Sequence, residues 1–509
     1  MQSWVRRASR AGSFAGGCIL LFAVGASSSA SAQSAYSGLF GGSFGRGNAG
    51  PAAEPLIDTR DFSLTPVVGL QETFTDNALL TATNKQFDFI TRPMVGADIK
   101  LQNGPATGTL TLHGYYDAYA REGQLSGFSG DAQGSGSYSL IPSFLSIDGD
   151  VLLTNTGVSQ FGSPAIDRAG TANRVMLATY DIGPRLTTTL DDFADVSVIG
   201  RFAQVYFGNP NNSTVGVPTD ATILEGAASI DTAQRYVGYQ LVTNAQVERD
   251  DQGFQAYNAQ QSIFVRIFPQ LRLIGRGGYD DVVQTGIVNI SAPMWSGGVE
   301  FTINQQSKIS VETGERYNHS AWAGDLRLQF SDQLYATGRY FEAIQPDQIQ
   351  VNSSFVSFVT PNTQLPPQLL TNSFLINGNL DNQTSLNKEA DLHLVYDWQG
   401  QSINLEATWN DRMLLALNAH DRSLVSGINY ERNIAPDLDF AAGVTYYHTF
   451  SNPFYGASEL YGGDVGLQYD INSTMQAVGG YAYRRQLQLF TNGQSITENV
   501  VFAAIAKKF

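Results

Sequence analysis

The sequence predicts an all-β chain that folds as one transmembrane antiparallel up-and-down β-barrel of about 20 strands, within a range of roughly 16 to 20. Three observations predict it: long segments of alternating polarity, links that alternate between short and long, and a final segment that ends in phenylalanine. The composition agrees, since 51 of the 509 residues are glycine and 11% are aromatic. An apolar content of 42% is too high for a disordered chain.

Residues 1–32 are predicted to be a secretory signal peptide that is cleaved on export. Arginines near the start precede an apolar run at 16–26, and small residues follow it up to Ala30-Ser31-Ala32. This order is typical of a signal peptide, and the apolar run is too short for a membrane anchor. Cys18, the single cysteine, lies in this segment, so we expect the exported chain to have no disulfide and no thiol nucleophile.

Residues 33–61 are rich in Gly, Ala, Ser and Pro, which indicates a flexible periplasmic segment ahead of a barrel at 62–509. An energised receptor would need a globular plug on the order of 100 residues or more in front of its barrel. The 29 residues of this segment therefore argue against that class. The formal net charge of −16 argues against nucleic acid as a partner, because phosphate binding needs clustered Lys and Arg.

From residue 62 onward, apolar and polar side chains alternate along most of the chain. The clearest segment is 293–304, and 321–331, 388–399 and 401–412 follow the same pattern. Most segments are about 11 to 17 residues long, whereas strands of soluble sheets are usually about 5 to 6 and tilted membrane strands need about 9 to 11. We therefore expect the apolar phase to face lipid and the polar phase to face enclosed water.

The links between these segments alternate in length, which predicts short periplasmic turns and longer extracellular loops. The short links lie at 103–105, 269–270, 305–306, 400, 433–436 and 472–473. The long links lie at 75–85, 122–133, 285–292, 413–421 and above all 345–387. Two links, at 154–171 and 209–233, break this alternation.

Four tryptophans follow the signal peptide, and all lie on the apolar phase near segment ends, where the aromatic girdle of a barrel meets the membrane surfaces. Ordinary core tryptophans of a soluble sheet are the alternative. The predicted girdle consists of Trp295, Trp322, Trp398 and Trp409.

The chain ends at Phe509, and Val501, Ala503 and Ile505 precede it at alternate positions. This ending resembles the sorting signal that outer-membrane barrels present to the barrel-assembly machinery, which we expect to be a partner during biogenesis through strand addition. Lys507 departs from the pattern, which usually has an apolar or aromatic residue at that position.

Residues 67–100 resemble the opening of a group of outer-membrane β-barrel porins. The resemblance rests on a turn at Phe74-Thr75-Asp76-Asn77 and a strand that begins Asp88-Phe89-Ile90-Thr91. Residues 295–339 and 345–387 are similar to members associated with exopolysaccharide and protein-sorting (PEP-CTERM/exosortase) systems. The resemblance implies a porin-like barrel in the outer membrane of a Gram-negative cell, with outer-membrane lipid around it and an envelope or polysaccharide-export partner.

The sequence predicts no enzyme, cofactor or metal site. His113 and Asp117 share the polar phase of one segment, but four residues of strand separate them by about 13 Å, too far for a direct hydrogen bond. We expect His113 to be a solvated lumen side chain, and the same holds for His393. Metal-ligand spacings and phosphate-binding glycine motifs are missing from the sequence. An outer-membrane hydrolase is the disfavoured alternative, because it would need a compact Ser/His or Asp/His site that the sequence does not indicate.

Charged side chains on the polar phase are the candidates for selectivity. We expect the arginines and the carboxylates to face each other across the lumen and to create a transverse field that orients polar solutes. The alternative is that these groups pair and solvate the wall. The arginines are Arg266, Arg272, Arg276, Arg327 and Arg339, and the carboxylates are Glu300, Glu312, Asp325, Asp391 and Glu406.

These features together predict a passive channel for small hydrophilic or saccharide-like solutes, linked to exopolysaccharide export. A barrel of about 16 strands or more encloses an aqueous lumen unless loops fill it. The alternative is a non-conducting structural or secretion-associated barrel in which 345–387 is the docking or plugging element. The sequence leaves open whether 345–387 folds into the lumen or outward.

Overall fold

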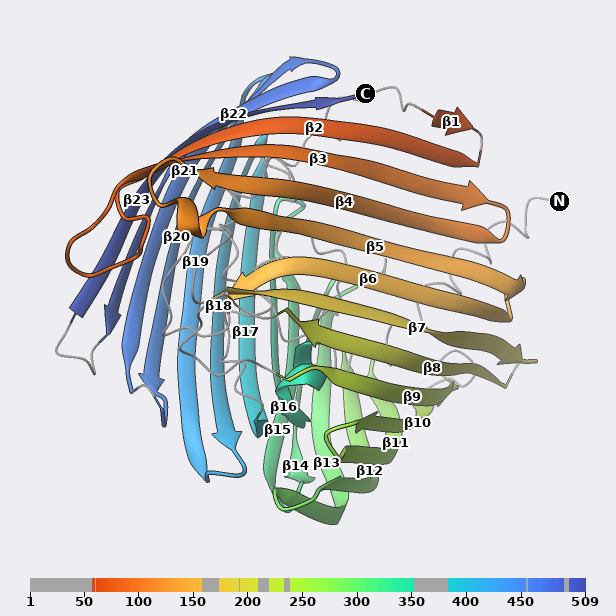
Figure 1. Ribbon diagram of the computed structural model, residues 1–509. Helices are drawn as coiled ribbons and strands as arrows, with labels where there is room; N and C mark the ends of the chain where they lie inside the picture. Colours follow the sequence, from red (N-terminus) through yellow and green to blue (C-terminus); the bar gives the residue numbers. More distant parts are fainter. Residues whose placement is uncertain are drawn as a thin grey trace.

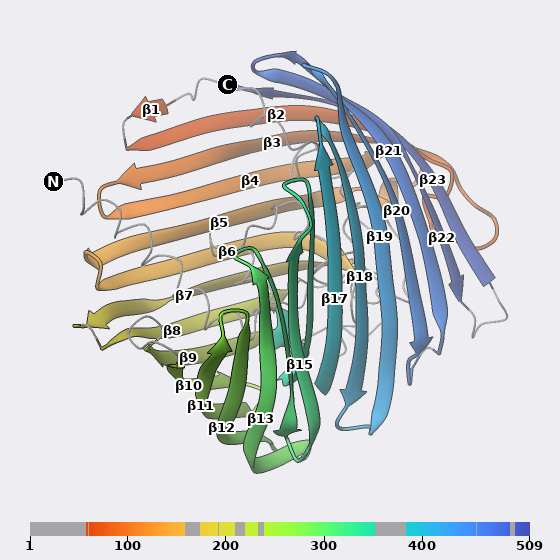
Figure 2. The same cartoon turned by 180° about the vertical axis from the view of Figure 1, so that it is seen from behind.

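The computed structural model is a closed antiparallel β-barrel (Figures 1 and 2). It describes residues 57–59, 61–157, 174–191, 193–208, 219–232, 239–351, 383–454, 456–488 and 494–509. The predicted signal peptide and most of the predicted flexible segment lie outside these residues.

In the described part of the chain, 22 strands form the wall, and the short β1 (Ile57–Thr59) pairs with the start of β2. The wall strands are β2 (Phe62–Thr75), β3 (Asp88–Asn103), β4 (Ala106–Tyr119), β5 (Gly127–Ile141), β6 (Leu145–Gly157), β7 (Arg174–Leu190), β8 (Ala194–Phe207), β9 (Ala221–Asp231), β10 (Tyr239–Asp250), β11 (Phe254–Phe268), β12 (Leu271–Gln284), β13 (Val288–Asn304), β14 (Ser307–Arg316), β15 (His319–Gln329), β16 (Leu334–Pro346), β17 (Thr384–Trp398), β18 (Gln401–Leu414), β19 (Ala419–Ala435), β20 (Leu438–Ser451), β21 (Ser458–Asn472), β22 (Met475–Gln488) and β23 (Gln494–Lys508).

Each wall strand pairs with the next one along the chain, and β2 pairs with β23 to close the ring. The closing ladder runs from Val67 opposite Lys508 to Thr75 opposite Val500. We call the rim where β2 begins and β23 ends the terminal rim, and the opposite one the loop rim. The up-and-down topology is as predicted, whereas the number of strands lies above the predicted range.

Two strands account for the difference, because sequence analysis missed β6 and β9. The turn between β5 and β6 contains Pro142, but the apolar residues Ile141 and Phe144 flank it and extend the apparent segment. With β6 and β9 in place, the links 158–173 and 208–220 both lie at the loop rim, and the alternation has no exception at these positions.

The links at the terminal rim are short, and six of them hold two residues: 104–105, 269–270, 305–306, 399–400, 436–437 and 473–474. The loop rim carries the longest link, 347–383, but also short ones. The predicted long link at 285–292 is wrong, because the alternation continues through Val288 to Ala292 and leaves a turn of three residues.

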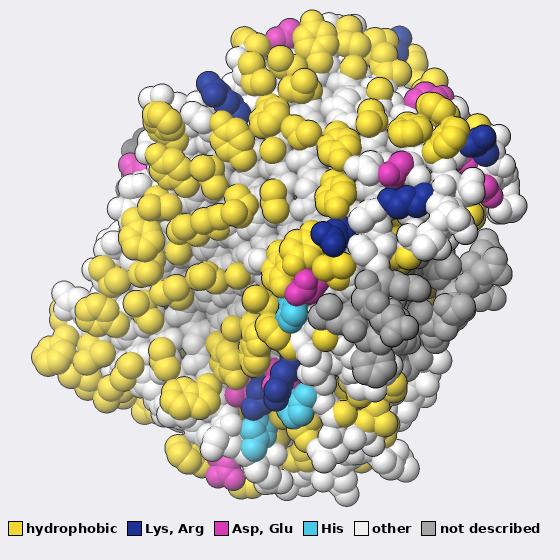
Figure 3. Space-filling view, turned by 90° about the vertical axis from the view of Figure 1, so that its left-hand side faces the viewer, with side chains coloured by type: hydrophobic (Ala, Val, Ile, Leu, Met, Phe, Trp, Pro, Cys, Tyr) yellow, Lys and Arg dark blue, Asp and Glu magenta, His cyan; other side chains and the backbone are white. Residues whose placement is uncertain are grey.

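The outer face of the wall is apolar, as the predicted phase requires. Large side chains such as Val95, Phe128 and Val444 point outward with exposed fractions of 64%, 84% and 61%. Figure 3 shows hydrophobic side chains spread over much of one side of the molecule. A closed wall with an apolar exterior is the surface that a transmembrane barrel presents to lipid.

No helix in the described ranges is long and apolar enough to cross a membrane.

The turn motif that carries the family resemblance stabilises the closing seam, by which we mean the pairing of β2 with β23. The Asp76 carboxylate accepts two hydrogen bonds from Asn499 of β23, one from the backbone N–H and one from the side-chain amide, both at 2.7 Å. The Asn77 side chain donates to the carbonyl oxygens of Thr81 and Thr497, both at 2.8 Å. These contacts extend the connection between β2 and β23 beyond the end of their ladder.

We therefore expect Asp76→Ala to lower the free energy of unfolding by about 1–3 kcal/mol, since both hydrogen bonds to a charged acceptor are lost. Urea unfolding of the detergent-refolded barrel measures this value. Asp332→Ala is the matched control, because Asp332 is exposed in the turn between β15 and β16. Equal losses in the two variants would contradict a role of Asp76 in the seam.

Candidate functional site: the lumen and its mouth

At the loop rim, the end of β16 and the start of β17 turn toward the lumen, since both faces of these strands are buried there. Every residue from Glu342 to Pro346 is buried. The ladder between β15 and β16 holds six residue pairs, which end at Gly324 opposite Tyr340. Beyond this point the Glu342 carboxylate fills the gap, where it lies 2.9 Å from Nε2 of His319 and accepts a hydrogen bond from the Trp322 backbone N–H at 3.1 Å.

Helical residues 347–351 continue this inward path and contact two separate parts of the wall. The Asp347 carboxylate forms an ion pair with Arg412 of β18 at 2.5 Å, and Arg412 also lies 3.7 Å from Asp421 of β19. On the other side, the Gln348 amide donates to the Thr219 hydroxyl oxygen at 3.2 Å, just ahead of β9. Residues 344–351, which we call the inturned segment, therefore reach across the mouth of the barrel.

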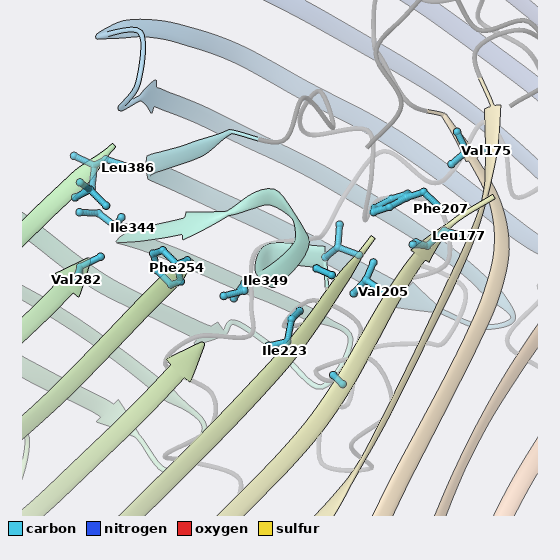
Figure 4. Packing of buried hydrophobic residues seen from close by; sticks show 14 of the residues in the cluster. Val175, Leu177, Val205, Phe207, Ile223, Phe254, Val282, Ile344, Ile349 and Leu386 are labelled. Carbon is cyan, nitrogen blue, oxygen red and sulfur yellow. The ribbon is translucent and has the colours of Figure 1, made fainter. Parts of the chain in front are cut away.

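A hydrophobic cluster lies inside the barrel where the inturned segment meets the wall. Ile349 is fully buried, and Figure 4 shows Ile344, Ile349 and Leu386 among wall residues that include Ile223 and Phe254. The wall contributes Val175, Leu177, Ala203, Val205, Phe207, Ala221, Ile223, Phe254, Val282 and Val288 to the cluster.

Polar contacts at the edge of this cluster also connect separate strands. The Thr384 hydroxyl at the start of β17 donates a hydrogen bond to Gln284 at the end of β12. Tyr317 lies in the turn between β14 and β15, where burial raises the pKa of its phenol to about 12. The ring therefore packs against the cluster as a neutral group.

The structure thus places both ends of the long predicted loop, 345–387. Of 345–387, residues 345–351 and 383–387 belong to the inward-leaning hairpin and the inturned segment, and residues 352–382 lie outside the described residues. Sequence analysis did not identify Asp347 or Arg412 as partners. The available signal was the apolar character of both phases at 175–178 and 221–224, which marks wall residues that do not face water on the inside.

The predicted selectivity residues line the lumen, but they do not face each other across it. They lie on neighbouring strands between β11 and β18 and pair along the wall, because strands that are adjacent in sequence are adjacent in the ring. Arg276 binds Glu312 with two contacts of 2.7 and 2.9 Å. Arg272 lies 3.4 Å from Glu300. The expected placement on opposite sides is therefore wrong.

The remaining candidates continue the same side of the lumen. Asp325, Arg339 and Asp391 are directly opposite one another in register on β15, β16 and β17, and Thr408 of β18 donates to Asp391 at 2.7 Å. Arg266 lies opposite Arg272, Arg327 opposite Lys308 and Glu406 opposite His393.

On the N-terminal strands, a second group of inward side chains is paired locally. Arg92 of β3 binds Asp117 of β4 with contacts of 2.5 and 3.0 Å, and its guanidinium lies over the Tyr115 ring. His113 lies 2.9 Å from Asp131 of β5. His113 and Asp117 thus have different partners and do not form a catalytic pair.

The tryptophans point outward, but they do not all lie near strand ends. Trp322 lies three residues from the start of β15, and Trp398 is the last residue of β17. Trp295 and Trp409 lie in the middle of β13 and β18, since β13 begins at Val288. The girdle role stays a prediction for Trp322 and Trp398.

The residues of the predicted sorting signal lie on the last strand and at its end. Val501, Ala503 and Ile505 are exposed on the outer face of β23, and the Phe509 backbone N–H donates to the Pro66 carbonyl oxygen at 2.9 Å. The Lys507 ammonium lies 4.5 Å from the centre of the Phe509 ring. Recognition by the assembly machinery stays a prediction.

In the ranges that the structure describes, no group of three or more His, Cys, Asp and Glu side chains is arranged to hold a metal ion.

Comparison with known proteins gives structural neighbours of low similarity. No protein-family model matches the chain, and no curated protein matches it. A mutant of the ferric enterobactin receptor PfeA from Pseudomonas aeruginosa has 11% identity and a TM-score of 0.45, with 88% of this chain and 80% of that chain covered. The siderophore receptor PirA from Acinetobacter baumannii has 9% identity and a TM-score of 0.48 at the same coverage. The ferric-catecholate import receptor Fiu from E. coli K12 has 9% identity and a TM-score of 0.49, with 87% and 81% covered.

The ion pair of Asp347 with Arg412 generates a prediction about the inturned segment. Removing one partner of a buried pair costs about 3–5 kcal/mol, since the other charge is left buried. We expect Arg412→Gln to release the segment, so that a cysteine at position 349 (Ile349→Cys) reacts with a maleimide about a hundredfold faster or more.

The control for this labelling experiment is Arg422→Gln. Arg422 pairs with Asp411 but is about half exposed, so its loss should leave Ile349→Cys protected. If Ile349→Cys reacted at the same rate with and without Arg412→Gln, Arg412 would not anchor the segment.

Proposed function

We propose that the protein is a non-enzymatic outer-membrane channel for small hydrophilic solutes, with a mouth that the inturned segment narrows. The observation that carries the proposal is the opposite character of the two faces of one closed wall. Apolar side chains such as Val95 and Val444 cover the outside, and ion pairs such as Arg276 with Glu312 line the inside. This division suits a wall with lipid on one side and water on the other.

The lumen would select solutes by bore and by short-range polar contacts. Because the arginines and carboxylates of β12–β14 are paired, their fields largely cancel at a distance, and a solute experiences them only near the wall. In this proposal the terminal rim, with its short links, faces the periplasm, and the loop rim faces the outside of the cell. Passage requires no cofactor and no covalent step.

The mouth supports a second candidate, a non-conducting barrel that serves as a structural or secretion-associated partner. The observation that favours it is the attachment of residues 347–351 to two parts of the wall, through Asp347 and Gln348. The link to exopolysaccharide export belongs to the first candidate, the channel, and it rests on the family resemblance of the sequence. Saccharides of increasing size are therefore the first solutes to test.

Planar-bilayer recordings of the refolded chain separate the two candidates. A channel gives discrete conductance steps, and liposomes that contain it swell at rates that fall with sugar size. We expect Asp347→Asn to increase the conductance, because it removes one charge of the pair that holds the inturned segment. Glu459→Gln is the control, since Glu459 lies near His448 and away from that segment. No steps from either wild type or Asp347→Asn would rule out the channel.

The paired wall also predicts a change in ion selectivity for Arg276→Gln. The substitution leaves Glu312 without its cation, so the lumen gains one net negative charge. A unit charge several ångströms away in water is worth about RT, and we expect the cation-to-anion permeability ratio to rise about two- to threefold. Reversal potentials in a salt gradient measure this ratio. Arg432→Gln, on the outer face of β19, should leave it unchanged.

A reversal potential that is the same in wild type and Arg276→Gln would show that the paired wall does not set selectivity. The same result with Arg272→Gln would extend that conclusion to the neighbouring pair.

A further inference from the structure

Two cations lie close together near the loop rim, beside the closing seam. Lys85 belongs to the link between β2 and β3, which lies next to the loop-rim ends of β22 and β23 (Figures 1 and 2). Its ammonium group donates a hydrogen bond to the Thr497 hydroxyl of β23. Arg485 of β22 is opposite Thr497 in register, and its Nε donates to the Ser495 hydroxyl at 3.3 Å. The two cations therefore approach Thr497 from its two neighbouring sides.

These side chains lie on the outer face of the wall. Thr497 is on the same phase of β23 as Val501, whose exposed fraction is 51%, whereas Glu498 on the other phase is fully buried. Arg485 is exposed, and the side chain of Lys85 has an exposed fraction of 32%. Both cations are therefore accessible from the side of the wall that faces the membrane.

The positive charge of this pair is only partly neutralised. Asp76 lies 3.9 Å from Lys85, but its carboxylate already accepts two hydrogen bonds from Asn499. Among the described residues, no carboxylate forms an ion pair with Arg485, whose acceptor is the neutral hydroxyl of Ser495. On a chain with a net charge of −16, the two cations are thus a local site for an anion.

Aromatic and apolar side chains continue the same surface around the pair. Tyr461 is opposite Arg485 in register, and its ring lies 5.1 Å from the ring of Tyr446. On β23 the outward side chains become apolar toward the terminal rim, where Val501 and Ile505 have exposed fractions of 51% and 40%. Tyrosines are enriched where a barrel meets the headgroups of a membrane. The two cations therefore lie at the headgroup level, with an apolar surface below them.

The arrangement suits an anion that carries an acyl chain. Arg and Lys side chains, together with hydroxyl donors, bind phosphate through charge-assisted hydrogen bonds. An apolar surface directly below the cations would contact the chains of a lipid, and a free anion would gain nothing from it.

We propose that Lys85, Arg485 and Thr497 bind the phosphate group of a lipid of the outer leaflet, on the outer face of the closing seam. This inference rests on the proposed function for one point, the outer-membrane location with the loop rim toward the outside. Because Lys85 follows β2 and Arg485 lies on β22, the bound phosphate would connect the two sides of β23.

Calorimetric titration of the refolded full chain in dodecyl maltoside micelles tests the site. The probe is lipid A, an acylated disaccharide with phosphate groups, and the matched probe is the same lipid without its phosphates. We expect lipid A to bind at least about tenfold more tightly than the dephosphorylated lipid. The double substitution Lys85→Gln and Arg485→Gln should weaken lipid A binding about tenfold or more.

The matched control is the double substitution Arg432→Gln and Lys507→Gln. It also removes one Arg and one Lys, from the terminal-rim ends of β19 and β23, and should leave lipid A binding unchanged. The heat-dependent gel mobility of each barrel confirms folding before titration.

Equal binding of lipid A by wild type and the Lys85→Gln, Arg485→Gln variant overturns the site, and so does an equal loss in the control variant. Equal binding of lipid A and the dephosphorylated lipid overturns the role of the phosphate. Inorganic phosphate that binds as tightly as lipid A would assign the site to the free anion and overturn the lipid. Conductance without lipid A binding contradicts this inference alone, and lipid A binding without conductance contradicts the channel alone.

Discussion

Complete backbone pairing is the constraint on which the rest of this structure depends. In hydrocarbon an unpaired N–H or C=O group has no water to bind, so a membrane sheet must have no edge. The ladder between β2 and β23 removes the two edges that a linear series of strands would leave. Once the ring is closed, each strand has one face toward the surroundings and one toward the lumen, and the alternation of the sequence follows from that.

The closed wall also explains why the inner charges pair with neighbours. Consecutive strands of an up-and-down barrel are adjacent in space, so residues that are close in the sequence line one side of the lumen. Arg276 and Glu312 are 36 residues apart but sit on β12 and β14, within reach of each other. Opposing charges across a lumen would require residues about half a ring apart in strand order.

The sequence predicted the class of fold and the face of most side chains, because period-2 alternation reports directly which side of a strand is apolar. It did not predict β6, since Ile141 and Phe144 continue the apolar pattern across the turn at Pro142. It also did not predict the mouth, since Asp347 and Arg412 are 65 residues apart and neither lies in a recognisable motif. Contacts between the inturned segment and the wall depend on the tertiary structure alone.

The position of the closing seam has a consequence for how the chain is made. Thr75 and Glu498, which hydrogen-bond across it, are separated by 423 residues of a chain of 509, so this contact joins its two ends. Pairing of neighbouring strands involves short loops, but joining the first strand to the last must wait for the complete polypeptide. Until then the growing sheet has two bare edges, and a chain that ended before β23 would keep them and be prone to aggregate.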